Sequence, residues 1–309
     1  MSSRSLRTQL VEAARRNSAR AVRTLIEAGA KGTAKQLIDA ARANETNVVA
    51  ALIESGAKGT RSQLETAARL RELAVVAALI QSGAKGTRPQ TLEAASRNEP
   101  AVVDALARSG VDLDVVLFEA ALHGEAEAIP VLIECGADPN APGRNGSVPL
   151  YAAAALRGRR HVKVDAIRRL REAGADPNDS GNGFEPILHS VAKSVGWGYA
   201  PSPVEHIGVL LEAGADPDAR DHNGTTALHA VVWAHLHDRA EEPDPAPYAA
   251  AIAALLAGGA SPHARDSFGR TPLECATRNP GRADPAVLAA LGKNPADRVR
   301  APYRATHRR

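Results

Sequence analysis

A glycine followed by a small apolar residue recurs at a nearly constant interval along this chain of 309 residues. An interval of this length is typical of repeat proteins, in which each repeat is one supersecondary structure that buries its apolar face against its neighbours. The interval therefore predicts a stack of similar repeats without a central core. The glycines are equally spaced at Gly29, Gly56, Gly83 and Gly110, and the series continues with Gly136, Gly174, Gly214 and Gly259.

Two helical patterns belong to each repeat. Before each glycine, apolar residues recur at helical spacing, as at Val49, Leu52 and Ile53, which is the pattern of a helix with one buried stripe. The glycine then supplies the left-handed position that ends a helix without steric cost. A second pattern, Leu-x-x-Ala-Ala, lies upstream, as at residues 37–41. Helices this short are unstable alone, so we predict an all-α fold, an α-solenoid of about nine helix-pair repeats.

The C-terminal half carries further motifs between its helices. Gly-Ala-Asp-Pro is followed by Asn or Asp at 136–140, 174–178 and 214–218. Two helix starts read Asp-His-Asn-Gly-Thr-Thr-Ala-Leu-His at 221–229 and Asp-Ser-Phe-Gly-Arg-Thr-Pro-Leu at 266–273. These segments resemble the ankyrin repeat family, whose repeat contains Asp-x-x-Gly-x-Thr-Pro-Leu-His-x-Ala-Ala, a second helix and Gly-Ala-Asp-x-Asn. The resemblance implies antiparallel helix pairs joined through short β-hairpin fingers in this half. We place only His229 at the histidine of the motif, since Leu188 takes that position in the preceding repeat.

The repeats divide the chain into three parts. Residues 1–110 form four repeats that carry a short Lys-Gly-Thr link in place of a finger, and residues 111–292 form five ankyrin repeats. Three of these five are lengthened, at 157–160, 196–203 and 237–247, and residues 293–309 form a basic tail. Net charge follows the same division, because 1–110 carries 17 basic against 10 acidic residues, 111–292 carries 15 against 24, and the tail carries 6 against 1.

Candidates for chemistry are few. We find no phosphate-binding loop, zinc-protease motif or nucleophile elbow. His235, His237 and Asp238 are close in sequence but do not share a helix face, so we interpret them as an exposed helix end rather than a metal site. Cys135 and Cys275 lie in apolar helical patterns, and we expect both to be buried free thiols. We predict no catalytic residue, metal or cofactor.

Basic residues form rows in the N-terminal repeats. Arg15, Arg42 and Arg69 recur at the interval of the glycines, Arg97 nearly continues the row, and Lys31, Lys58 and Lys85 form a second row. One interpretation is a basic strip that attracts an acidic partner surface. The other is that cations at helix C-termini favour the helix dipole by about 0.3–1 kcal/mol each. The two interpretations are compatible.

In the C-terminal half, the resemblance to ankyrin repeats implies that finger tips and the ends of first helices contact partners. Trp, Phe and Arg are enriched among residues that dominate binding energy. The alternative to partner binding is a structural role, in which Trp233 packs between helices and Phe268 contacts a neighbouring finger. The candidate binding residues at these positions are Arg144, Asn145, His222, Asn223, Trp233, Phe268 and Arg270.

These observations predict a non-enzymatic scaffold that binds one or more proteins, including one with an acidic surface, on a preformed surface of the repeats. The chain start lacks an apolar signal segment and no apolar run spans a membrane, so we expect a cytoplasmic protein. The alternative is a binder of nucleic acid or another polyanion through the Arg and Lys rows. Nucleic acid is disfavoured because no aromatic residue precedes Phe118 and residues 111–292 are acidic. An enzymatic site within the 196–247 insertions is a further alternative.

Overall fold

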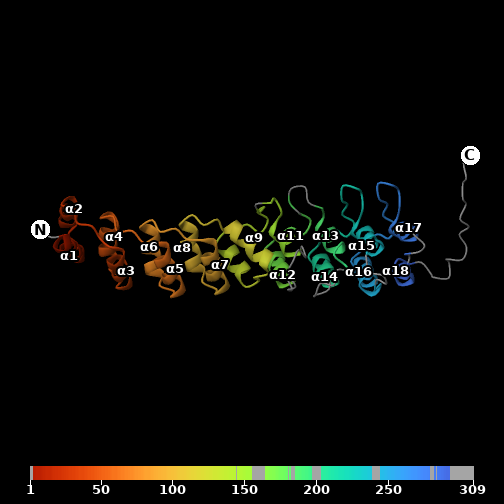
Figure 1. Ribbon diagram of the computed structural model, residues 1–309, viewed down its shortest axis with the longest axis horizontal. Helices are drawn as coiled ribbons and strands as arrows, with labels where there is room; N and C mark the ends of the chain where they lie inside the picture. The colour runs from red at the N-terminus through yellow and green to blue at the C-terminus, as the bar shows by residue number, and fades with distance from the viewer. Residues whose placement is uncertain are drawn as a thin grey trace, which may run out of the picture. The chain divides into compact units, whose positions relative to one another are not determined.

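The computed structural model describes residues 3–143, 145–154, 164–179, 181, 185–196, 203–238, 244–278, 282 and 284–292 (Figure 1). These residues form 18 α-helices and no β-strand, so the predicted all-α class is confirmed. None of the helices described is long and apolar enough to cross a bilayer. Arg144, the tail after residue 292, the insertion at 157–160, and residues 197–202 and 239–243 of the other two insertions lie outside these ranges.

The chain divides into two compact units. Unit 1 consists of Met1–Ala120 and Glu127–Asp138, and unit 2 consists of Ala121–Ala126 and Pro139–Arg309. The helices of unit 1 are α1 (Ser3–Arg15), α2 (Ala19–Glu27), α3 (Ala34–Arg42), α4 (Thr46–Glu54), α5 (Arg61–Arg69), α6 (Leu73–Gln81), α7 (Arg88–Ser96), α8 (Pro100–Arg108) and α10 (Ala128–Glu134), with the larger part of α9 (Leu113–His123).

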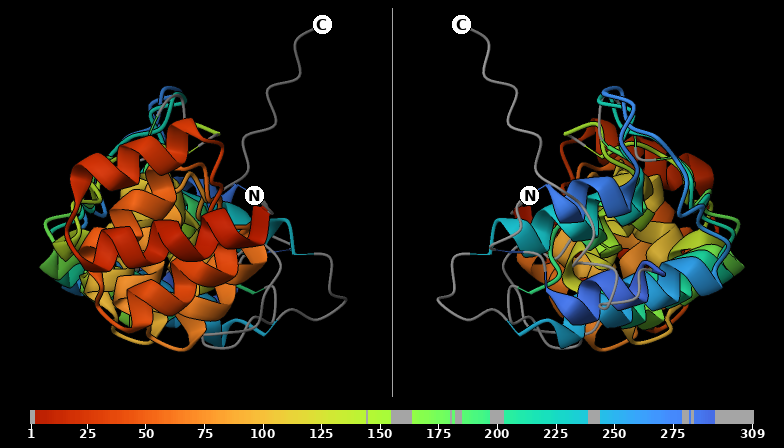
Figure 2. Two further views of the ribbon diagram at one scale, coloured as in Figure 1. Left: turned by 90° about the vertical axis from the view of Figure 1, so that its left-hand side faces the viewer. Right: turned by 90° about the vertical axis from the view of Figure 1, so that its right-hand side faces the viewer.

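Consecutive helices of unit 1 pack as pairs, as in α1 and α2, which run alongside each other (Figure 2, left). Each pair also contacts the next, since α3 contacts both α4 and α6, and α5 contacts both α6 and α7. The interior is aliphatic: Leu37 and Leu64 are fully buried, and the paired alanines beside them, such as Ala40 and Ala41, are nearly so. Small side chains at these positions let the helices approach closely enough for the aliphatic side chains to interlock.

Threonines begin the first helices of the N-terminal repeats. Thr33 accepts a hydrogen bond from the backbone N–H of Gln36, and the Gln36 side chain accepts one from the N–H of Thr33. Thr60 and Gln63 make the same reciprocal pair. Each pair satisfies two of the N–H groups that a helix start leaves without a partner. The Lys-Gly-Thr link therefore ends in a helix cap.

Both helices of each N-terminal repeat end at a left-handed residue. All eight recurring glycines have positive φ, which confirms the predicted helix-ending role. The first helices end in the same way at Asn17, Asn44, Arg71 and Asn98, with φ between 53° and 59°. Asn is the residue that best tolerates this conformation after glycine. We did not predict these ends, although Asn17 and Asn44 are themselves separated by the interval of the glycines.

A serine connects each Lys-Gly-Thr link to the following repeat, and the first two of these serines, Ser55 and Ser82, are buried. The N–H of Gly32 donates to Oγ of Ser55 at 2.9 Å, and that hydroxyl donates to the Leu52 carbonyl at 2.8 Å. The N–H of Gly59 and that of Gly86 donate to Ser82 and Ser109 in the same way. A β carbon on Gly32 would lie 2.7 Å from Cδ2 of Leu52 and 2.9 Å from Oγ of Ser55. The repeats thus approach each other at a point where only glycine fits.

Unit 2 also consists of helix pairs. Within it α13 contacts its partner α14 and the equivalent helices α11 and α15, and α14 contacts α12 and α16. Its last pair lies at the end seen in Figure 2 (right). The helices are α11 (Pro149–Ala154), α12 (Val164–Glu172), α13 (Ile187–Ala192), α14 (Pro203–Glu212), α15 (Ala227–Leu236), α16 (Ala246–Ala257), α17 (Pro272–Thr277) and α18 (Pro285–Ala290).

Loops between the pairs of unit 2 contain tight turns, but the expected β-hairpin fingers are not confirmed, because the described residues contain no strand (Figure 1). The turn before α17 contains two backbone bonds of 2.9 Å, from the N–H of Asp266 to the Arg270 carbonyl and from the N–H of Gly269 to the Asp266 carbonyl. The Asp266 carboxylate accepts the N–H groups of Phe268 and Arg270. Since the side chain takes these donors, they do not pair across a strand ladder.

Buried histidines connect neighbouring repeats in unit 2. Nδ1 of His229 accepts from the N–H of Thr226 at 3.2 Å, and Nε2 lies 3.0 Å from the Arg270 carbonyl of the next repeat. Nε2 of His189 lies 2.6 Å from the Thr225 carbonyl in the equivalent arrangement. Our placement of the motif histidine was therefore wrong, because His189 as well as His229 occupies that position. The error arose because Pro186 lies at the cap position of α13 and not one residue later.

Burial favours the neutral form of both histidines. Burial lowers the pKa of each imidazole, more than the neighbouring carbonyl and carboxylates raise it. In His229 the acceptor role of Nδ1 requires the proton to be on Nε2, where it is donated to Arg270. A second proton on Nδ1 would face the N–H of Thr226.

We expect Gly32→Ala to destabilise unit 1 by about 1–3 kcal/mol, because the new methyl group overlaps Leu52 and Ser55. The matched control is Gly208→Ala in α14, where a β carbon meets nothing within 4 Å. This control should stabilise the chain by about 0.5–1 kcal/mol through reduced backbone entropy. Urea unfolding measures both, and equal effects of the two substitutions would contradict the close approach.

We also expect the free energy of unfolding to fall as the pH drops below about 6.5, the ordinary pKa of histidine. The folded pKa values of His189 and His229 lie below that of the unfolded chain, so the unfolded state binds more protons in this range. Each histidine contributes at most about 1.4 kcal/mol per pH unit. Replacing both by Gln, the residue at the equivalent cap position in Gln36, should reduce this pH dependence. The exposed control His222→Gln should retain it, and a pH dependence unaffected by the double variant would refute the assignment.

Candidate interaction surface

The arginines of the N-terminal repeats form ion pairs between and within repeats. Nε of Arg15 lies 3.0 Å from Glu45, and Arg42 makes two bonds of 3.0 Å to Glu72. Each pair joins the end of one first helix to the start of the second helix in the next repeat, 30 residues away. The guanidinium charges in this part of the predicted basic strip are therefore compensated by carboxylates.

The third repeat departs from this pattern. Arg71, at the left-handed position, lies 2.6 Å from the Glu99 carboxylate, which is only 8% exposed. Arg69 instead pairs with Glu65 at 3.1 Å and lies 3.7 Å from Glu93. Arg97 also binds Glu93, at 2.5 Å. All four arginines of the predicted row thus have a carboxylate partner, which the sequence spacing did not indicate.

The lysine row behaves differently. Lys31, Lys58 and Lys85 are exposed, and none forms a salt bridge with a described residue. In unit 1 the uncompensated positive charge at repeat spacing therefore comes from lysines of the links, not from the arginine row.

Asn145, His222 and Asn223 are candidate residues that lie in turns of unit 2. Asn145 accepts hydrogen bonds from the N–H and hydroxyl of Ser147, which shape its own turn. His222 and Asn223 are exposed neighbours at the turn before α15, where Nδ2 of Asn223 lies 2.9 Å from Nε2 of His222. The Asn223 carbonyl accepts the N–H of Ser267 at 3.0 Å, so adjacent turns are joined.

Two predicted aromatic residues, Trp233 and Phe268, lie close to the guanidinium of a third predicted residue, Arg270. Cζ of Arg270 lies 4.5 Å from the ring centre of Phe268 and 5.7 Å from that of Trp233. Phe268 is 75% exposed and Trp233 is 38% exposed. Trp233 also stacks on His237, with ring centres 5.4 Å apart. We call Trp233, Phe268 and Arg270 the aromatic patch; its rings lie on the surface, so neither is fully used in packing.

A buried carboxylate fixes the centre of the aromatic patch. Oδ2 of Asp266 accepts from Nε of Arg270 at 2.9 Å and from its terminal nitrogen at 2.7 Å, and the Asp266 side chain is fully buried. Burial alone would raise the pKa of the Asp266 carboxyl, but bonds from the side chain and N–H of Arg270 hold it below its ordinary value. The aromatic patch is therefore preorganised.

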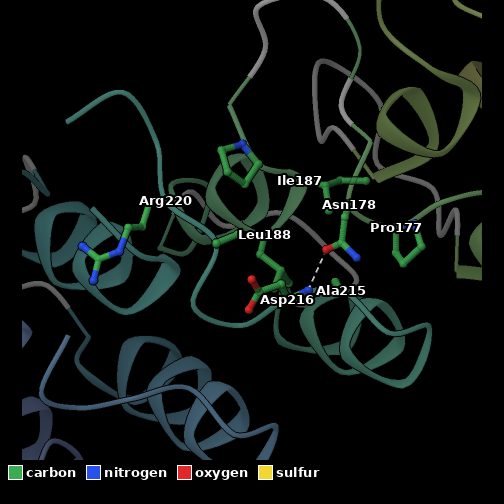
Figure 3. Close-up of a pocket in the computed structure, with 9 residues that line it drawn as sticks. Pro177, Asn178, Ile187, Leu188, Ala215, Asp216 and Arg220 are labelled. Atoms are coloured by element: carbon green, nitrogen blue, oxygen red, sulfur yellow. Dashed lines mark hydrogen bonds between the residues drawn. The ribbon is translucent and has the colours of Figure 1, made fainter. Parts of the chain in front are cut away.

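Two hollows lie in unit 2. The first, of about 640 Å³ among the described residues, has Trp233, His237 and Lys193 in its wall, beside the aromatic patch. The second, of about 320 Å³, is lined by Pro177, Ile187 and Leu188 among others (Figure 3). Its polar groups have internal partners. Oδ1 of Asn178 accepts the N–H of Asp216 (Figure 3). Arg220 donates to the carbonyls of Gly224 and Arg265. These groups are occupied within the fold and so are poorly placed to orient a ligand.

One group of side chains has the composition of a metal site. Ligand atoms of His229, Asp266 and Cys275 lie within 4.8 Å of one another, and all three residues are buried. Both nitrogens of His229 and both oxygens of Asp266 already take part in hydrogen bonds. Burial raises the pKa of the Cys275 thiol, which disfavours the thiolate that binds metal. A metal would have to displace several bonds that hold two repeats together.

The remaining candidates for chemistry, the histidines of α15 and the two cysteines, differ in their exposure to solvent. The expected exposed helix end is wrong for His235, which is buried in α15 with its ring edge-on to that of Tyr248. His237 is exposed, and its Nδ1 lies 2.8 Å from the Trp233 carbonyl. Cys275 is buried as predicted, but the prediction was wrong for Cys135, which is only half-buried. Cys135 is more exposed than expected because α10 ends at Glu134 and leaves this residue at the helix edge. Its thiol lies 3.4 Å from the Pro100 carbonyl.

Comparison with protein-family models gives no match for this chain, and comparison with curated proteins gives none either. The resemblance to ankyrin repeats therefore rests on the motifs of the sequence.

We expect Asp266→Asn to destabilise unit 2 more than the equivalent Asp221→Asn, by about 1–3 kcal/mol. An asparagine oxygen can still accept the two turn N–H groups that each aspartate binds. Only Asp266 also holds a guanidinium, so the difference between the variants isolates that ion pair. Urea unfolding measures both variants, and equal losses would show that Arg270 is not anchored by Asp266.

Proposed function

We propose that the chain is an ankyrin-type repeat scaffold that binds a partner protein in the cytoplasm without catalysing a reaction. The binding surface is the aromatic patch together with the neighbouring turn residues His222 and Asn223. Repeated helix pairs, helix-ending glycines and bonds between adjacent turns support the repeat assignment.

The exposed, preorganised aromatic patch is the observation that carries this proposal. Leaving 75% of a phenylalanine exposed is unfavourable in the free chain, and a partner that covers it gains the hydrophobic free energy. The guanidinium between the rings is fixed by Asp266, so few side-chain rotamers are lost on binding. Aromatic residues and arginine are also the side chains that most often dominate the energy of protein interfaces.

Binding of a polyanion through the arginine row receives less support. Arg15, Arg42, Arg69 and Arg97 each have a carboxylate neighbour. Phosphate groups would have to compete with these carboxylates. Only the three lysines of the N-terminal rows lack a salt bridge to a described residue.

Affinity capture with the full chain as bait tests the proposal in an extract of the cells that produce it. We expect a protein that binds wild type and the control Leu70→Ala, whose side chain is 58% exposed in unit 1. Capture should fall at least about tenfold with Trp233→Ala/Phe268→Ala, since two aromatic contacts exceed about 1.4 kcal/mol. Equal capture by all three baits would contradict the proposed surface, and loss of capture after nuclease treatment would favour the polyanion alternative.

A further inference from the structure

The sign of the charge reverses along one row of equivalent positions in unit 1. Each position lies two residues after a helix-ending glycine. It is occupied by Lys31, Lys58 and Lys85, then by Asp112 and Asp138, and the first four of these are equally spaced in the sequence. We call these five residues the reversing row.

The positions are structurally equivalent as well as regularly spaced. The glycines that precede them, from Gly29 to Gly136, all have φ between 86° and 100°. Each glycine ends the second helix of its pair, and consecutive pairs of unit 1 contact one another. Equivalent positions in stacked repeats form a line, and neighbouring helices are about 8–10 Å apart. Adjacent charges of the reversing row therefore have similar spacing on both sides of the reversal.

The side chains of the reversing row lie on the surface. All five residues are exposed. The lysines form no salt bridge with a described residue, in contrast to the arginine row, where every charge is compensated. Asp112 accepts the N–H groups of Asp114 and Val115 through Oδ1 at the start of α9. The other oxygen of that carboxylate can still accept a bond from a cation.

A row that changes sign at its centre is complementary to itself when rotated by half a turn. If two copies meet with their rows antiparallel, the point between Lys85 and Asp112 becomes the two-fold axis. Lys85 then faces Asp112 of the other copy, and Lys58 faces Asp138, so two pairs occur on each side of the axis. A row of uniform sign would repel its copy in the same arrangement.

We propose that the reversing row is a self-association surface whose partner is a second copy of this chain in antiparallel orientation. The contact needs residues of unit 1 alone. It is independent of the aromatic patch, which stays accessible to a different partner. Glu54 and Glu134 lie beside the row, at the ends of α4 and α10, and both are negative. They cannot pair with each other across the contact, so the ion pairs have to come from the row itself.

The proposal predicts self-association that depends strongly on salt. Exposed ion pairs are individually weak and are screened by ions. The Debye length falls from about 30 Å at 0.01 M salt to about 3 Å at 1 M. Sedimentation equilibrium of the purified full chain should show dimers at low salt, with a dissociation constant at least about tenfold larger at high salt. A chain that is monomeric at low salt up to millimolar concentration would overturn the proposal.

Charge exchange tests the pairing directly. Lys58→Glu/Lys85→Glu gives a row that is negative at four positions, and Asp112→Lys/Asp138→Lys gives a row that is positive throughout. Each variant alone should be monomeric at low salt. An equimolar mixture should form heterodimers, because every facing pair is again of opposite sign. Dimers of either variant alone, or a mixture that stays monomeric, would contradict the antiparallel pairing.

Two controls separate charge from folding. Asp112→Asn/Asp138→Asn keeps an oxygen for the cap of α9, so loss of self-association in this variant does not depend on the cap. Lys35→Glu places the same charge change at an exposed residue outside the row and should leave the dimer unchanged. Circular dichroism checks the helix content of each variant. Trp233→Ala/Phe268→Ala should dimerise like wild type, so failure of the dimer and failure of partner binding are distinguishable.

Discussion

Contact between neighbouring helix pairs is the interaction on which both units depend. The second helices of the N-terminal repeats are nine residues long, too short to be stable in water without neighbours. Their buried side chains are mostly Leu, Val and Ala, so each pair contributes little apolar area by itself. In unit 1 the Gly32–Ser55 bond and its equivalents connect one repeat to the next. In unit 2 the histidines and Asn178 have this role, the latter binding Asp216 and Gly214 of the following repeat.

The position of a basic residue within the repeat determines whether it forms a salt bridge. An arginine at the end of a first helix reaches the glutamate that begins the next second helix, as Arg42 reaches Glu72. A lysine in the link, such as Lys58, has no acidic neighbour within salt-bridge distance among the described residues. Both rows have the same period in the sequence, yet one is compensated and the other is not. Net charge per segment therefore describes the surface of unit 1 poorly.

The sequence allowed the helix class, the helix pairs and the helix-ending glycines to be predicted, because each depends on residues close together in the chain. The partners of Arg15 and Arg42 depend on how one repeat is rotated against the next, and spacing alone does not contain that angle. His189 was misplaced for a local reason, since Pro186 was matched to the proline of the motif although it lies at the helix cap. In the candidate surface, Trp233, Phe268 and Arg270 were predicted as separate contacts. Their meeting required Asp266, which the motif identified as a turn residue but not as the buried partner of Arg270.

Two repeats of unit 2 can be compared position by position. Some positions maintain the fold in both repeats, and others differ between them. Thr226 and Thr271 both cap a first helix, and Asp221 and Asp266 both close a turn. Between them, Thr225 in one repeat corresponds to Arg270 in the next. Because the frame is maintained by the caps and turn carboxylates, the intervening position can take a large cation without loss of the turn. At this position the arginine orders two exposed aromatic rings, so a frame shared by these two repeats presents a surface that belongs to one of them.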